Sequence, residues 1–121
     1  MKRVAIVVQR CHESVVGGSE ALAWQYARLL AQRHDVEVLT STAIDYLTWE
    51  SVLPAGCSEH AGIRIRRFPA TIARGAYWTR LHQRLMQAAG AIRNTEGSQT
   101  DWREALQDEF LRFQGPYCPG L

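Results

Sequence analysis

The chain has little of what disulfide-rich, metal-binding or nucleic-acid-binding proteins use. Its three cysteines are an odd number without C-x-x-C spacing, so neither a disulfide framework nor a zinc site is indicated. His12 lies next to Cys11, but nothing nearby supplies further ligands, and no metal or other cofactor is expected. A net charge of +2 is too small to indicate a nucleic-acid partner.

Long apolar runs are also missing. No run approaches the length of a membrane span, and the short apolar run that follows Lys2 and Arg3 is too short for a signal peptide. We therefore expect a cytoplasmic protein. The composition, 46% hydrophobic and 21% charged residues in 121, is typical of one globular α/β domain.

The first 40 residues are organised as strand, loop, helix and strand. Residues 4–8 form an apolar, β-branched run that suits a buried parallel strand, and residues 36–40 form a second one. Between them, Ser19 is the expected N-cap of a helix over residues 21–33. This order predicts a right-handed βαβ unit. The helix would cover the sheet with one apolar stripe, which consists of Leu22, Ala23, Tyr26, Ala27, Leu29 and Leu30.

The turn before this helix predicts an anion site. The first N–H groups of a helix lack partners and carry partial positive charge, and two glycines leave them accessible. A phosphate can therefore approach the backbone at Gly17, Gly18 and Ser19, beyond the carboxyl end of the first strand. The loop is neither G-x-G-x-x-G nor a P-loop, so a tight turn that only permits close packing is an equal alternative.

The order of these motifs resembles the opening of the family 4 glycosyltransferases of GT-B architecture. The family pattern of two glycines, a small residue and glutamate occurs here as Gly17-Gly18-Ser19-Glu20. Residues 61–69 resemble the family's third strand, and residues 114–119 resemble a segment of some members. The resemblance implies an α/β fold with a Rossmann-like parallel sheet and flanking helices, as the first, acceptor-side part of such an enzyme.

The family reaction transfers a sugar from a nucleotide-sugar donor to an acceptor hydroxyl with retention and without a metal. Gly17 and Gly18 would contribute to binding the donor phosphates, and His12 would contact the acceptor. Glu20 either binds a sugar hydroxyl or braces the loop, and bracing is favoured because the helix dipole stabilises a carboxylate there. Members of the family carry a second domain that holds the nucleotide sugar, and these residues do not include it. The chain alone should therefore be inactive, and no catalytic residue is assigned.

Residues 43–60 have no clear pattern. Residues 45–50 form either a short helix or an ordered loop on the same edge as the glycine turn. Tyr46 and Trp49 there either stack on an acceptor sugar or pack over the sheet edge, which is the commoner use of aromatic residues. Residues 62–68 alternate as an edge strand, with Ile63, Ile65 and Arg67 on one face and Arg64, Arg66 and Phe68 on the other.

The remaining chain predicts two more helices. Residues 75–93 carry an apolar stripe that either docks on the sheet or lies on an anionic membrane, where the family meets lipid-linked acceptors. The stripe consists of Tyr77, Trp78, Leu81, Leu85, Ala88, Ala89 and Ile92. Residues 94–100 form a polar linker, and Asp101 caps a third helix over residues 102–113 with Trp102, Leu106, Phe110 and Phe113 at helical spacing.

A half-sheet with the strand order 3-2-1 leaves the first strand, residues 4–8, with an open edge. Self-association through this edge is therefore expected. The same edge supports an alternative function, a non-catalytic module that binds phosphate or recruits a partner strand.

Overall fold

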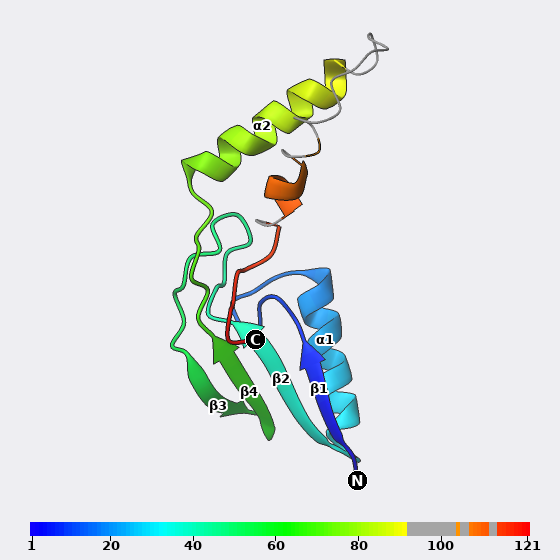
Figure 1. The fold of residues 1–121 in the computed structure, drawn as a ribbon. Coiled ribbons are helices and arrows are strands. Elements are labelled where there is room, and N and C mark those ends of the chain that lie inside the picture. Colours follow the sequence, from blue (N-terminus) through cyan, green and yellow to red (C-terminus); the bar gives the residue numbers. More distant parts are fainter. Residues whose placement is uncertain (92–103, 105–106, 112–113) are drawn as a thin grey trace. The chain divides into compact units, whose positions relative to one another are not determined.

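The computed structural model describes residues 1–91, 104, 107–111 and 114–121 (Figure 1). It divides into two units, and each is treated by itself. Residues Met1–Ala73 and Pro116–Leu121 form the first unit, and residues Arg74–Gly115 form the second.

The first unit is an α/β domain with an open, mixed sheet. It contains β1 (Arg3–Val7), α1 (Gly18–Leu30), β2 (Asp35–Ser41), β3 (Gly56–His60) and β4 (Ile63–Phe68). The strand order is β1-β2-β4-β3, with β1, β2 and β4 parallel and β3 antiparallel to β4. The predicted parallel βαβ unit is thus confirmed, and the predicted parallel sheet is found for β1, β2 and β4, while β3 makes the sheet as a whole mixed.

The prediction that residues 62–68 form an edge strand is also wrong, because β4 lies between β2 and β3. Its alternation is confirmed, since Ile63 and Ile65 are buried while Arg64 and Arg66 are exposed. The two exposed arginines pair with acidic residues of β2: Arg64 with Asp35, and Arg66 with Glu37. Their face of the sheet is therefore neutralised across neighbouring strands.

The helix α1 starts earlier than expected. It begins at Gly18, its N-cap is Gly17, and no side chain caps it. Ser19 therefore belongs to the first turn and is not the N-cap; its hydroxyl donates to the Glu20 carboxylate at 2.8 Å. A carboxylate in the first turn suits the positive end of the helix dipole, so Glu20 stabilises the helix start in place of a capping hydroxyl.

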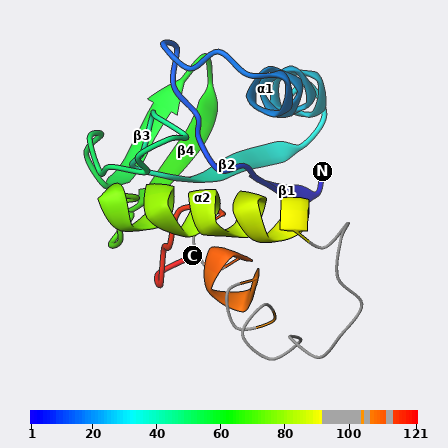
Figure 2. The same cartoon turned by 90° about the horizontal axis from the view of Figure 1, so that it is seen from above.

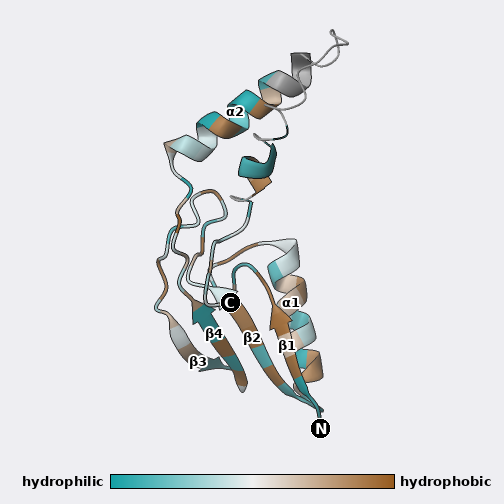
Figure 3. Cartoon of the chain, viewed as in Figure 1, coloured by the Kyte–Doolittle hydropathy of each residue, from teal (hydrophilic) through white to brown (hydrophobic). Residues whose placement is uncertain are grey.

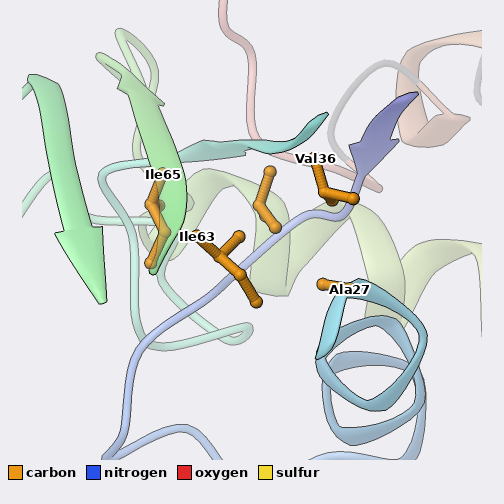
Figure 4. Packing of buried hydrophobic residues seen from close by; sticks show 5 residues of the cluster. Ala27, Val36, Ile63 and Ile65 are labelled. Carbon is orange, nitrogen blue, oxygen red and sulfur yellow. The ribbon is translucent and has the colours of Figure 1, made fainter. Parts of the chain in front are cut away.

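The contact face of α1 centres on Ala27, which is fully buried against Val36, Val38, Ile63 and Ile65 of the sheet. Figure 4 shows Ala27 pointing from the helix towards the strand residues, and Figure 2 shows α1 lying on one face of the sheet. Trp24, Leu30 and Ala31 pack around this cluster. Because a helix repeats every 3.6 residues, this face leaves Leu22, Tyr26 and Leu29 exposed, and the predicted stripe is wrong at those three positions.

The strand β1 lies at one edge of the described sheet, as expected from the 3-2-1 order. The Val8 N–H donates to the Leu39 carbonyl, and the Lys2 carbonyl accepts from the Asp35 N–H, so these groups face β2. Figure 3 shows that β1 is mostly hydrophobic. The last residues return to this unit, where the Tyr117 carbonyl accepts a hydrogen bond from the Thr71 N–H at 3.0 Å.

The second unit contains α2 (Ala76–Ala91), which confirms a helix in the predicted position. Residues 104 and 107–111 are also helical, in agreement with the predicted third helix. Within this unit the rings of Trp78, His82 and Phe110 stack on one another, with centroids 5.1 to 5.9 Å apart. Trp102, Leu106, Phe113 and the linker 94–100 lie outside the described residues, and the membrane or sheet contact of α2 stays a prediction.

Candidate functional site

The glycine turn lies where the βαβ unit places it, at the start of α1 and after the carboxyl end of β1. Its two glycines differ in their surroundings. A Cβ built on Gly18 would meet no atom within 4 Å, whereas one on Gly17 would collide with the Glu20 carboxylate and lie 3.2 Å from Arg10 Nη2. Protein side chains thus occupy the space beside Gly17, and open space remains only beside Gly18.

The group beside Gly17 is an ion pair between Arg10 and Glu20 that no pattern in the sequence predicts. Arg10 donates from Nε and Nη2 to Oε1 of Glu20, at 2.8 and 2.5 Å, and from Nη1 to the Ile44 carbonyl at 3.0 Å. Both side chains of the pair are 9% exposed. A single arginine between the first strand and the glycine turn was the only signal in the sequence, and it does not reveal which carboxylate the arginine meets.

The environment of Glu20 favours its ionised form. Burial by itself raises the pKa of this carboxyl group. The hydrogen bonds from Ser19 and from its own backbone N–H, together with the hydrogen bonds and charge of Arg10, outweigh the burial and leave the pKa below its ordinary value. Glu20 is therefore a charged group held at the positive end of α1.

This arrangement bears directly on the predicted phosphate site. The start of α1 already faces an internal carboxylate, so a phosphate must either approach at Gly18 or displace Glu20 from Arg10. Of the two interpretations of Glu20, bracing of the loop fits the structure, because its carboxylate is engaged by Arg10 and Ser19.

Next to this pair lies a cleft of about 480 Å³, within the range typical of small-molecule sites. The cleft is bounded by the loop after β1, the first turns of α1, a loop before β3, and the β3–β4 hairpin. Its lining residues are Cys11, His12, Glu13, Val15, Glu20, Ala21, Trp24, Leu53, Pro54, Ser58, Glu59, His60, Ile65 and Arg67. Of the predicted site residues, His12 and Glu20 line this cleft.

Arg67 joins two walls of the cleft. Its Nη1 donates to Ser58 Oγ on β3, and its Nη2 donates to the Cys11 carbonyl in the loop after β1, both at 2.9 Å. Burial raises the pKa of the Cys11 thiol, and the positive charge of Arg67 offsets only part of this effect. Cys11 is therefore held as a thiol rather than as a reactive thiolate.

Aromatic and imidazole rings also line the cleft. The rings of Trp24 and His60 lie 5.4 Å apart between centroids and are tilted by 44°. His12, the predicted acceptor contact, accepts a hydrogen bond at Nδ1 from the Ser14 N–H at 3.1 Å. The opposite nitrogen of its ring takes no part in that bond.

Tyr46 and Trp49, the other predicted acceptor contacts, are not among the residues that line the cleft. Trp49 is 2% exposed and has a positive φ of 51°, so packing inside its loop fits its position better than stacking on a sugar. Tyr46 is 55% exposed, and the Arg10 guanidinium lies 5.3 Å from its ring centroid. One face of Tyr46 thus covers the ion pair.

Fold and site together define an α/β domain in which a cleft lined by both apolar and polar side chains adjoins a glycine turn at the start of the first helix. No protein family, no curated protein and no solved structure matches the chain. Among the residues that the structure describes, no three histidine, cysteine, aspartate or glutamate side chains gather as a metal site would require. In the same part of the chain, no helix has both the length and the apolar character needed to cross a membrane.

Proposed function

We propose that this chain is the first, acceptor-side part of a GT-B glycosyltransferase that transfers a sugar from a nucleotide-sugar donor to an acceptor hydroxyl with retention. The second nucleotide-sugar domain lies outside these residues, so the chain alone does not transfer sugar. The enzyme works in the cytoplasm, and at the inner face of the membrane when its acceptor is lipid-linked.

The observation that carries the proposal is the cleft beside the glycine turn. In open α/β sheets, ligands bind beyond the carboxyl ends of the parallel strands, and this cleft extends from that edge between α1 and the β3–β4 hairpin. It combines an aromatic ring, Trp24, with hydrogen-bonding groups such as Ser58 and His60. Sugar rings need this mixture, since they present C–H groups to aromatic faces and hydroxyls to polar side chains.

Different residues of the site bind the acceptor and the donor. Trp24 and His12 contact the acceptor in the cleft, and the open backbone at Gly18 faces the donor phosphates. Peptide N–H groups and basic side chains stabilise the negative charge that develops on a leaving diphosphate, so this reaction needs no metal. The Arg10–Glu20 pair holds the loop and the helix start in place.

The test is binding of sugars to the 121-residue chain, observed through chemical-shift changes in NMR spectra. Monosaccharides should shift resonances of the cleft residues, and Trp24→Leu should abolish these shifts. Tyr26→Leu is the matched control, because Tyr26 is an aromatic residue on the same helix but is 53% exposed on another face. Shifts of the same size in both variants would contradict the proposal.

A transfer assay tests the donor side. The longest natural protein that contains these residues is incubated with nucleotide sugars, and release of the free nucleotide is measured. Turnover with any donor supports the assignment, and its absence with all common donors, together with absent sugar binding by the chain, overturns it.

A non-catalytic interaction module is the second candidate, and two observations favour it. Glu20 already occupies the space beside Gly17, and β1 lies at an edge of the described sheet. An open strand edge can pair with another strand. Light scattering distinguishes the candidates, since a mass well above the monomer's 13.7 kDa at micromolar concentration, without sugar binding, supports the module.

A further inference from the structure

Arg67 differs from the other two arginines of β4 in what it contacts. Arg64 and Arg66 form ion pairs with Asp35 and Glu37 on the face of the sheet opposite to α1. Arg67 donates only to neutral oxygens, those of Ser58 and Cys11. Among the described residues, no carboxylate lies within ion-pair distance of it.

The remaining acidic groups of the cleft do not neutralise this charge. Glu20 is already paired with Arg10. Glu59 also lines the cleft, but it forms no ion pair with Arg67, and strand register places it opposite Arg64, on the other face of the hairpin from Ser58 and Arg67. Glu13 lies in the exposed loop after β1. Arg67 therefore carries a positive charge that no ion pair among the described residues neutralises.

The hydrogen-bonding capacity of Arg67 is also incompletely used. Its Nε is buried and has no hydrogen-bond partner, and the two bonds that it makes leave one hydrogen on each terminal nitrogen. A half-buried guanidinium without an anion is costly, because burial removes water that would otherwise solvate the charge. A ligand that brings an anionic group into the cleft would remove part of this cost.

We propose that Arg67 recognises an anionic group of the ligand and that the acceptor is a sugar carrying a carboxylate or a phosphate. That the ligand is a sugar rests on the proposed function. That it carries an anionic group rests on Arg67, which has no ion-pair partner and has unused hydrogen-bond donors. Arginine suits the role, because its planar guanidinium matches the oxygens of carboxylates and phosphates. Trp24 would contact the ring of the sugar while Arg67 holds its acidic group.

Titration calorimetry on the whole chain at low salt tests the proposal, with four probes: D-glucuronate, D-glucose 6-phosphate, D-glucose and inorganic phosphate. At least one acidic sugar should bind, D-glucose should bind about 10- to 100-fold more weakly, and Arg67→Gln should reduce acidic-sugar affinity by a similar factor. Arg66→Gln, on the same strand but the opposite face, is the matched control and should leave the affinity unchanged. Comparison of the two acidic sugars identifies carboxylate or phosphate as the preferred group.

Circular dichroism must first show that Arg67→Gln is folded; if it is not, Arg67→Lys replaces it, with a smaller loss of affinity expected because lysine keeps the charge but not the planar fork. Equal binding of D-glucose and acidic sugars would overturn the anion inference and leave the glycosyltransferase proposal standing. Binding of inorganic phosphate as tight as that of both sugars, and dependent on Arg67, would support anion recognition and count against a sugar site. Absence of binding by all four probes would overturn both.

Discussion

Arg10 and Glu20 form an ion pair that closes the start of α1 with the protein's own charges. Two nitrogens of Arg10 meet the same carboxylate oxygen of Glu20, and the third donates to the Ile44 carbonyl in the segment after β2. One guanidinium therefore connects the loop after β1, the first turn of α1 and the segment after β2. These three segments surround the glycine turn, so the shape of the candidate site depends on this pair.

Loss of Arg10 should destabilise the fold. Arg10→Met leaves the Glu20 carboxylate without its partner at a position where both side chains are 9% exposed. We expect the free energy of unfolding, measured by urea titration, to fall by about 3 kcal/mol. Arg66→Met removes an ion pair whose arginine is 46% exposed and should cost less than about 1 kcal/mol. Equal losses in the two variants would show that the buried pair has no special role.

The same pair should make the stability depend on pH in the acid range. The pKa of Glu20 is lower in the folded chain than its ordinary value of 4.5, so folding favours the ionised carboxylate. This contribution is present above pH 4.5 and is lost as the pH falls through the folded pKa. The free energy of unfolding of the wild type should therefore decrease more steeply below pH 4.5 than that of Glu20→Gln. Parallel curves for the two proteins would contradict the assignment.

The two glycines of the turn should respond differently to alanine. Gly17 has an extended backbone with φ of −173°, which any residue adopts, so the cost of Gly17→Ala comes from the collision of its Cβ with the Glu20 carboxylate. We expect a loss of about 1 to 3 kcal/mol. Gly18→Ala meets open space and should be neutral or stabilise by about 0.5 kcal/mol, because alanine restricts the unfolded chain.

The cost of Gly17→Ala can also be measured in a chain that carries Glu20→Ala, which tests whether the collision causes the loss of stability. In Glu20→Ala the colliding carboxylate is absent, so adding Gly17→Ala should cost little in urea titrations. If Gly17→Ala costs the same in both backgrounds, the collision with Glu20 is not its cause.

Local patterns in the sequence predicted much of the fold. The apolar runs of β1 and β2 and the helical pattern between them were enough for the parallel βαβ unit, and the alternation of β4 correctly assigned Ile63 and Ile65 to the buried face. The stripe on α1 was predicted less well, because Leu22, Tyr26 and Leu29 are as hydrophobic as the residues that face the sheet. Which of these residues face the sheet depends on how the helix is rotated about its own axis. The packing of Ala27 against the sheet fixes that rotation, and the sequence pattern of the helix alone does not show it.

The strand β3 and the interaction of Arg10 were beyond such patterns. All five residues of β3 are exposed and show no apolar alternation, so its position depends on backbone pairing with β4 rather than on burial. The contact of Arg10 with Glu20 and Ile44 joins segments that are 10 and 34 residues apart. Neither sequence separation follows from the period of a strand or a helix, and the residues of the β3–β4 hairpin that form another wall of the cleft were missed for the same reason.

The turn between β3 and β4 supplies the last prediction. Ala61 and Gly62 both have positive φ, 50° and 74°, as required in a two-residue hairpin turn of type I′. Alanine is strained in this conformation because of its Cβ, whereas asparagine tolerates it. Ala61→Asn should therefore raise the free energy of unfolding by about 0.5 to 1 kcal/mol, measured by urea titration. Gly62→Ala introduces the same strain at the second position and should lower it by about 1 kcal/mol. A destabilised Ala61→Asn variant would show that the hairpin does not use this turn, and the wall of the cleft that holds Arg67 would then need a different backbone.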